Sequence, residues 1–266
     1  MKIMCLNGWG GKLHGELTAY ISSEDPDILC LQEVVHSPES DLDWLTYRDG
    51  DHVLPQRANF FRDICLALPN HMGIFCPAAQ GVLWQNDQAI PSQWGLATFV
   101  RKTFPIIAQA QGFAHKCFSP DGYGDHPRSR SVHAIRLYDF EKSRSVSITQ
   151  MHGLRDLRGK MDTPERTEQA RRLLEFSDRV SEPEDAAVIC GDFNVEPESE
   201  TLAILADQGF EDLVLAGRFE GTRTSHYNKP NRFADYMLVN QWVDVMKFDV
   251  VREPEVSDHC PLLLTL

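Results

Sequence analysis

The chain has 266 residues, of which 42% are hydrophobic and 24% are charged. This length and composition suit one large α/β domain or two small ones, and no apolar run approaches the roughly 20 residues of a membrane span. With 26 Lys and Arg against 39 Asp and Glu, the net charge of −13 opposes long-range attraction to nucleic acid or to an anionic membrane. Any binding of phosphate must therefore be local.

The start of the chain and its cysteines bear on where the protein works. Met1 to Cys5 lead straight into a strand-like pattern without a signal peptide, so we expect a cytoplasmic protein. The seven cysteines include no Cys-x-x-Cys pair, and their odd number fits reduced thiols. We therefore expect neither a zinc site nor a disulfide framework.

The first part of the chain alternates apolar runs with loops. Residues 2–6 predict a strand that ends at Asn7, and residues 13–23 predict a helix. Residues 28–31 predict a second apolar strand, which Glu33 closes. An acid at the edge of a buried strand is costly unless it is paired or bound to a cation, so Glu33 is a candidate metal ligand; the alternative is an acid that simply faces water.

Helical spacing of aromatic residues stands out in the next part. Phe60, Phe61 and Ile64 predict a helix over residues 55–68 with its aromatic face inward. A short strand is expected over residues 71–76, and a polar loop over residues 81–93. Residues 95–100 and 104–108 are expected to form two strands paired with each other, and residues 112–130 a long surface loop.

The second half contains the clearest local signals. Residues 131–138 and 145–151 predict a hairpin, and Thr163 followed by Pro164 predicts the start of a helix that runs to about Val180. Residues 186–190 predict a buried strand and residues 197–205 predict a helix. Three more strands are expected, over residues 233–239, 243–251 and 260–266. No linker or repeat interrupts the chain, so we expect one domain over residues 1–266.

Two polar side chains follow the buried strand of residues 186–190, where Gly191 permits a tight turn or a close approach. Alternation would point Asp192 and Asn194 to the same side while Phe193 anchors the turn in the core. The pair then offers a carboxylate and an amide to one substrate. An ordinary turn is the alternative, because Asp and Asn favour turns.

Basic residues gather in three loops despite the acidic composition. These sets are His126, Arg128 and Arg130; Arg155, Arg158 and Lys160; and Arg223, Lys229 and Arg232. Arg166 lies on the inner stripe of the helix after Thr163, where its guanidinium needs an acid or a phosphate partner. Each of these charges could also be an ordinary solvated charge or part of a structural salt bridge.

Polar side chains recur at the ends of several separate strands. Their number is larger than turns alone would require, which indicates an active site. Their order along the chain strongly resembles the endonuclease/exonuclease/phosphatase superfamily. The motifs that carry the resemblance are Leu6-Asn7, Leu31-Gln32-Glu33, Met151-His152-Gly153, Gly191-Asp192-Phe193-Asn194, Ala234-Asp235-Tyr236 and Ser257-Asp258-His259.

The resemblance implies an α/β (α+β) fold, a four-layer α/β/β/α sandwich of two mostly antiparallel sheets with flanking helices. It also implies cleavage of phosphate esters with Mg²⁺ or Mn²⁺. The implied metal ligands are Glu33, Asp258 and Asn7. Oxygen ligands of this kind suit a hard divalent cation that polarises a phosphoryl oxygen.

The remaining site residues follow from the same resemblance. Asp192 would orient or deprotonate the attacking water, and Asn194 would hold a phosphate oxygen without adding charge. Asp235 would hold one ring nitrogen of His259 so that the other faces the phosphate, and His152 would bind the phosphate from another side. The expected catalytic residues are Asp192, Asn194, His259, Asp235, His152 and Asn7, and the expected substrate-binding residues are His152, Asn194, Arg155, Lys160 and Arg166.

One residue departs from the pattern of the abasic-site endonucleases in this superfamily. They carry an acid two residues after the position of Asn7, where this chain has Trp9. In having His152, the chain instead resembles the deoxyribonuclease and sphingomyelinase branches, so we do not expect an abasic-site endonuclease. Because the chain lacks an extended basic groove, we expect a small phosphate ester or a nucleic-acid end as substrate. A DNA or RNA nuclease and a catalytically silent phosphate-binding module are the alternatives.

Overall fold

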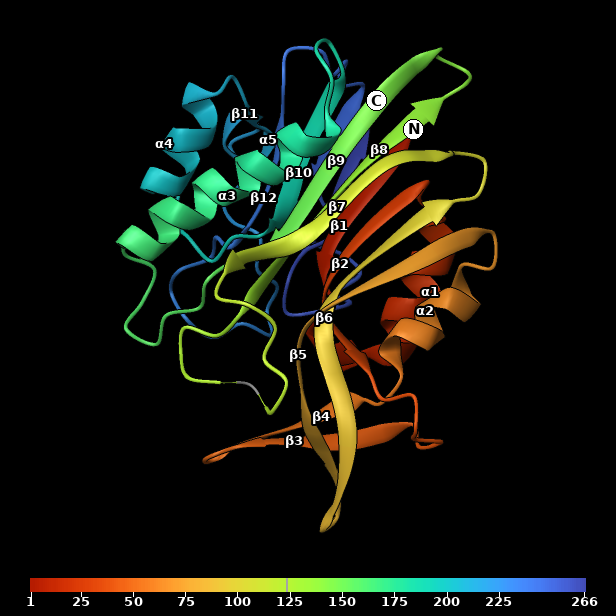
Figure 1. Ribbon diagram of the computed structural model, residues 1–266, viewed down its shortest axis with the longest axis vertical. Helices are drawn as coiled ribbons and strands as arrows, with labels where there is room; N and C mark the ends of the chain where they lie inside the picture. Colours follow the sequence, from red (N-terminus) through yellow and green to blue (C-terminus); the bar gives the residue numbers. More distant parts are fainter. Residues whose placement is uncertain (123) are drawn as a thin grey trace.

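Two β-sheets form the centre of the fold, and helices cover their outer faces (Figure 1). The computed structural model describes residues 1–122 and 124–266. The eight-stranded sheet has the order β13 (Lys247–Val250), β14 (Leu262–Thr265), β1 (Lys2–Asn7), β2 (Ile28–His36), β6 (Gln88–Arg101), β5 (His71–Gln85), β3 (Trp44–Asp49) and β4 (His52–Arg57). The six-stranded sheet has the order β11 (Glu211–Asp212), β12 (Asp235–Val239), β10 (Ala186–Asp192), β9 (Arg144–His152), β8 (Arg130–Asp139) and β7 (Ile106–His115).

Strand alternation divides the core into two hydrophobic layers. On β1, Ile3 and Cys5 belong to the cluster shared with the six-stranded sheet, and Met4 and Leu6 belong to the cluster beneath the N-terminal helices. All four side chains are at most 1% exposed, because β1 is covered on both faces. The first cluster therefore joins the two sheets face to face.

The helices complete the sandwich. On one side α1 (His14–Glu24) and α2 (Phe60–Ala67) pack on the eight-stranded sheet. On the other side α3 (Pro164–Val180) lies over β7, β8 and β9, with α4 (Glu200–Asp207) beside it and α5 (Leu213–Ala216) next to β12 (Figure 1). Within the described ranges, no helix has the length and apolar content needed to cross a lipid bilayer.

The predicted fold class is confirmed. All strand pairs are antiparallel except β1 with β2 and β9 with β10. The two parallel pairs lie at the centres of their sheets. At the end of β1, Asn7 pairs with Gln32 of β2, and at the ends of β10 and β9, Asp192 pairs with His152 in Cα register.

The prediction of a polar loop at residues 81–93 is wrong. This segment forms the far half of a long hairpin, in which β5 and β6 stay paired from His71 with Arg101 out to Gln85 with Gln88. The segment lacks a clear apolar pattern because this part of the hairpin projects from the body of the molecule, as Figure 1 shows at the bottom. Pairing of the two strands holds it there together with a few buried side chains, because Leu83 is fully buried in the cluster that includes Leu45 of β3 and Ile90 packs against that cluster.

Three other expected boundaries also need correction. The helix predicted over residues 55–68 begins only at Phe60, because the residues before it complete β4. Residues 95–100 lie in β6 and residues 106–108 lie in β7, and these two strands belong to different sheets and do not pair. Of the surface loop expected over residues 112–130, residues 112–115 belong to β7 and Arg130 starts β8, and residue 123 lies outside the described residues.

The strand that was expected to close at Glu33 continues to His36. The register between β2 and β6 shifts between Leu31 and Val34, and Glu33 has a φ of 55°. This is a β-bulge, which adds a residue to one strand and re-aims its side chain. The Glu33 side chain therefore keeps 39% exposure although its neighbours Gln32 and Val34 are buried.

The hairpin of β8 and β9 and the start of α3 are confirmed. Thr163 adopts an extended conformation and its side chain accepts a hydrogen bond from the Arg166 N–H, as an N-cap does. The helix expected from Pro197 starts at Glu200 instead, because Ser199 is the residue that caps it.

Candidate active site

Asp192 is the last residue of β10 and lies at the centre of the candidate site. Its Cα is in register with His152 on β9 and with Asp235 on β12. The strands can approach here because a Cβ on Gly191 would lie 2.1 Å from the Met151 carbonyl oxygen. Asp192 is only 1% exposed, so pairing of the strands alone brings three ionisable side chains together in the interior.

Asn7 connects this group to the other sheet. Its Nδ2 donates to Asp192 Oδ2 at 3.0 Å, and its Oδ1 accepts the Trp9 main-chain N–H at 3.0 Å. Its carbonyl oxygen accepts the Ser257 hydroxyl at 2.6 Å. One buried amide thus fixes the Asp192 carboxylate against the loop that leads to His259.

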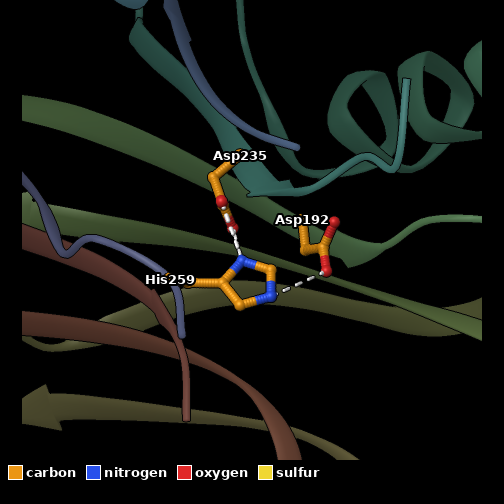
Figure 2. A group of neighbouring side chains, drawn as sticks. All are labelled: Asp192, Asp235 and His259. Atoms are coloured by element: carbon orange, nitrogen blue, oxygen red, sulfur yellow. Dashed lines mark hydrogen bonds and ion pairs between the residues drawn. The ribbon is translucent and has the colours of Figure 1, made fainter. Parts of the chain in front are cut away.

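His259 is held by Asp235, as the resemblance implied (Figure 2). The two carboxylate oxygens of Asp235 lie 2.9 and 2.8 Å from His259 Nδ1. Asp235 is itself positioned by the Thr222 hydroxyl, which accepts its main-chain N–H at 3.0 Å. The other ring nitrogen, Nε2, lies 3.7 Å from Asp192 Oδ2.

The protonation state of His259 follows from its partners. Burial lowers the pKa of His259 and the Arg223 guanidinium lowers it further, whereas burial raises the pKa of Asp235 and Arg223 opposes that rise. Nδ1 faces a carboxylate and therefore carries the hydrogen, while Nε2 accepts a hydrogen bond from Arg223 Nη1. His259 is then neutral near pH 7, and its Nε2 can receive a proton.

His152 lies on the other side of Asp192 in the opposite tautomer. Its Nδ1 is 3.4 Å from Arg130 Nη1, which can only donate, so Nε2 carries the hydrogen. Nε2 is 3.7 Å from Asp192 Oδ2 and 3.9 Å from Glu33 Oε1. Burial lowers the pKa of His152 well below its ordinary value, and Arg130 adds to this effect.

Glu33 and Asp258 are close enough for their charges to interact. Burial raises the pKa of Asp258, and the carboxylates of Glu33 and Asp192 add to that rise while His259 and Arg223 oppose it. Asp258 Oδ2 accepts a hydrogen bond from Arg223 at 2.8 Å, but its Oδ1 is buried with no hydrogen-bond partner in the part of the chain that the structure describes. An unsatisfied carboxylate oxygen close to a second, partly exposed carboxylate fits a hard divalent cation.

A second group of ligand atoms is more compact. Among the described residues, Asp192, Asp235 and His259 each offer one ligand atom within 4.8 Å of the other two (Figure 2). Both oxygens of Asp235 already contact His259 Nδ1, so a cation there would have to break this pair. The arrangement is better suited to moving a proton than to binding a metal.

Asn194 is placed differently from the sequence expectation. β10 ends at Asp192, and Asn194 has a φ of 55°, so strand alternation does not extend to it. Its main-chain N–H donates to Asp192 Oδ1 at 3.1 Å and helps to orient that carboxylate. Phe193 is fully buried, as expected of the residue that anchors the turn.

The loop between β9 and α3 contributes one cation close to the site. The Lys160 side chain is 13% exposed, and its ammonium group donates to the Phe233 carbonyl and lies 3.9 Å from Glu196 Oε1. Burial lowers the pKa of Lys160, while the charge of Asp192 raises it. Arg155 is exposed, and its charge contributes to lowering the pKa of His152.

Arg166 does not take the position expected of a substrate-binding residue. It is 2% exposed, and its guanidinium donates to the carbonyl oxygens of Met161, Leu154 and Gly159, at 3.3 and 3.0 Å for the last two. The partner that its buried charge requires is thus the backbone of the loop and not a phosphate. We therefore assign Arg166 to the shape of this loop.

Two arginines at the site were recognised in the sequence only as members of basic loops. Arg130 starts β8 and contacts His152, and Arg223 contacts both Asp258 and His259. Sequence alone gives no means to separate them from neighbours such as Arg128, whose guanidinium binds Asp49.

Comparison with solved structures shows the same architecture over whole chains. The mannosyl-6-phosphatase Bt3783 of Bacteroides thetaiotaomicron VPI-5482 has a TM-score of 0.69 at 16% identity, with 100% of this chain and 98% of that chain covered. The human Nocturnin catalytic domain with bound sulfate has a TM-score of 0.66 at 19% identity, with 99% and 93% covered. An endonuclease/exonuclease/phosphatase family protein from Leptotrichia buccalis C-1013-b has a TM-score of 0.69 at 15% identity, with 100% and 99% covered.

The sequence comparisons place the chain in a family. No curated protein matches it. A family model described as the endonuclease/exonuclease/phosphatase family matches residues 5–259, which include every site residue described above. This protein therefore belongs to the endonuclease/exonuclease/phosphatase family.

Proposed function

We propose that this protein is a divalent-metal-dependent phosphoesterase that cleaves its substrate by attack of a water molecule. The proposal rests on the two histidines that lie on either side of Asp192. His152 and His259 both place Nε2 3.7 Å from Asp192 Oδ2, and they have opposite tautomers. One imidazole can donate to a phosphate oxygen while the other can accept a proton.

Asp192 is the residue that orients the water. Asn7 and the Asn194 N–H each bind one of its two oxygens, so the carboxylate has a fixed direction. A carboxylate with a fixed direction can accept a hydrogen bond from water and align the water for in-line attack. The Asn194 amide and His152 would contact the phosphate, with Arg155 and Lys160 nearby.

The Asp235 and His259 pair handles the proton. Asp235 stabilises the imidazolium that forms when His259 Nε2 takes up a proton, as a carboxylate does for a catalytic histidine. Glu33 and Asp258, with Asn7 beside them, would hold Mg²⁺ or Mn²⁺. The cation would supply charge stabilisation at a phosphoryl oxygen.

A small phosphate ester or a nucleic-acid end is the substrate that we propose. The basic side chains close to Asp192 are few, and the net charge of −13 offers no extended path for a long polyanion. Among the relatives, one is described as a mannosyl-6-phosphatase and another was solved with a sulfate anion, and both descriptions agree with a site for a single phosphate-like group.

Nuclease activity is the second candidate, because an aromatic surface adjoins the site. Trp9 follows Asn7 by two residues, its ring centroid lies 5.8 Å from that of His226, and the Lys12 ammonium lies 3.8 Å from its centre. Aromatic rings with a nearby cation are a common platform for stacked bases. A Trp9→Ala variant that loses cleavage of RNA or DNA but keeps cleavage of small esters would favour this candidate.

The test is a substrate panel with Mg²⁺ or Mn²⁺ and a parallel series with EDTA. The panel contains small phosphomonoesters, small phosphodiesters, oligonucleotides with terminal phosphates, and plasmid DNA at low salt. We expect metal-dependent hydrolysis of at least one small or terminal ester that His259→Ala abolishes. No hydrolysis across the panel would make a catalytically silent phosphate-binding module the better account.

A further inference from the structure

Arg223 enters the site through a short backbone pairing. Its Cα is bridged to that of His259, and this bridge is flanked by hydrogen bonds from the Thr224 N–H to Asp258 and from the Cys260 N–H to Thr222. The Arg223 side chain is 7% exposed and stacks over the Tyr227 ring at 4.3 Å. The guanidinium is therefore a fixed part of the site and not a surface charge.

The contacts of Arg223 leave it poorly satisfied. Nη1 donates both to Asp258 Oδ2 and to His259 Nε2, while Nε has no hydrogen-bond partner among the described residues. A guanidinium that only balances charge would face a carboxylate with its two-pronged edge. Arg223 instead directs one nitrogen at the His259 ring nitrogen that must be free to take up a proton.

Arg130 has the corresponding position on the opposite side of Asp192. Nη1 of Arg130 is 3.4 Å from Nδ1 of His152, and its Nε also lacks a hydrogen-bond partner in the described ranges. His152 therefore lies between Asp192 and Arg130, whereas Asp192 and Arg223 both approach the same ring nitrogen of His259, Nε2. Two guanidinium groups thus flank the carboxylate that would align the water.

We propose that Arg223 and Arg130 form a two-guanidinium clamp for a phosphate dianion, and that the substrate consequently carries a terminal phosphate. This inference rests on the proposed function and names its substrate class. Phosphate oxygens are charged acceptors and bind guanidinium more strongly than a neutral imidazole does. Phosphate entry would draw Arg223 from His259 Nε2 and leave that nitrogen free for the proton.

The count of charges favours a monoester. A phosphomonoester carries two negative charges near pH 7, whereas a diester carries one. Two fixed guanidinium groups therefore gain more from the dianion, and part of that gain would be lost for a diester.

The experiment measures binding without turnover. Isothermal titration calorimetry with EDTA present would compare inorganic phosphate and dimethyl phosphate for the wild type, Arg223→Gln and Arg172→Gln. Arg172 is a matched control because it also pairs with a carboxylate, that of Glu168, on the exposed face of α3. We expect Arg223→Gln to bind phosphate at least about ten-fold more weakly, Arg172→Gln to bind as the wild type does, and the wild type to prefer phosphate over dimethyl phosphate.

Unchanged phosphate affinity in folded Arg223→Gln would overturn the proposal, and so would a wild type that does not bind phosphate or prefers the diester. If Arg223→Gln does not fold, Arg223→Lys decides, because it keeps the charge among the carboxylates but loses the planar fork. A loss of phosphate affinity in Arg223→Lys supports the clamp, and wild-type affinity refutes it. Phosphate binding that depends on Arg223 in a protein that hydrolyses no ester would keep the clamp and reject the proposed function.

Discussion

The Asn7 side chain donates to Asp192 Oδ2 at 3.0 Å across 185 residues of sequence and from one sheet to the other. Asn7 ends β1 and Asp192 ends β10, so this hydrogen bond joins the central strands of both sheets at the candidate site. Both residues are at most 1% exposed. The position of the Asp192 carboxylate is thus a property of how the two sheets pack, and a change in that packing should reach the site directly.

The pairing of Asp235 with His259 gives the first prediction. Asp235→Asn keeps the size of the side chain but can hold His259 in the wrong tautomer and cannot stabilise an imidazolium. We expect kcat to fall by about 10²- to 10⁴-fold with little change in the melting temperature. Steady-state kinetics on the best ester from the panel is the measurement, with exposed Asp244→Asn as the control. Activity within two-fold of the wild type, on the scale of about 0.4 kcal/mol, would remove the pair from the mechanism.

Metal binding gives the second prediction. A cation that binds only the folded state at 100 times its Kd raises the unfolding free energy by about 2.7 kcal/mol. We expect Mg²⁺ or Mn²⁺ to raise the melting temperature of the wild type and of exposed Glu16→Gln, and to have a much smaller effect on Glu33→Gln and Asp258→Asn. Differential scanning calorimetry with and without EDTA is the measurement. Equal stabilisation of all four proteins would show that Glu33 and Asp258 are not the ligands.

Asp212 gives a prediction about pH that does not involve the active site. It caps α5 by accepting the N–H groups of Val214 and Leu215, but its Oδ2 is buried with no hydrogen-bond partner among the described residues. Burial raises its pKa to about 6, against the opposing hydrogen bonds from the helix N-terminus. The folded protein therefore binds this proton more tightly than the unfolded chain does.

The sign of the effect follows from linkage. The contribution of Asp212 to stability is fully present below its unfolded pKa of 3.8 and is lost as the pH rises through its folded pKa of about 6. Asp212→Asn stays neutral, so the free energy of unfolding of the variant should gain on that of the wild type by about 2 to 3 kcal/mol between pH 4 and pH 7. Urea unfolding at several pH values measures this difference, and a difference that does not change with pH would contradict the burial of an ionising carboxyl there.

A variant of Arg166 can distinguish a structural role for this residue from the substrate contact that the sequence indicated. Arg166→Gln removes donors from three loop carbonyl oxygens, and we expect a loss of about 2 to 4 kcal/mol in the free energy of unfolding. Exposed Arg171→Gln on the same helix should stay within about 0.5 kcal/mol of the wild type. Urea unfolding is the measurement. Unchanged stability together with weaker phosphate binding would restore Arg166 as a substrate ligand.

The parts of the fold that sequence predicted well are those with a local physical cause. The run before Gly191 contains only apolar residues, which predicts a strand buried on both faces. Thr163 and Pro164 favour the start of a helix through local contacts alone. Polar residues near the ends of such runs indicated the candidate site for a related reason, because a buried acid or amide needs a partner.

The parts that sequence missed depend on distant partners. The far half of β5 and β6 is stabilised by pairing across a hairpin and by packing of Leu83 in one cluster with Leu45 of β3, so its own sequence shows no clear apolar alternation. The bulge at Glu33 exists only against β6. Arg223 is positioned by a backbone bridge to His259, which is 36 residues away, so no local sequence pattern predicts its position.

The central claim is that the Asp192 carboxylate aligns a water molecule for attack on a phosphate ester. The most direct measurement is the rate of hydrolysis of the best ester by Asp192→Asn, with Mg²⁺ present, against the wild type and against exposed Asp207→Asn. We predict that Asp192→Asn retains its fold and its phosphate affinity and loses at least about 10²-fold in kcat, while Asp207→Asn is unchanged. A folded Asp192→Asn protein that turns over at the wild-type rate would contradict the account.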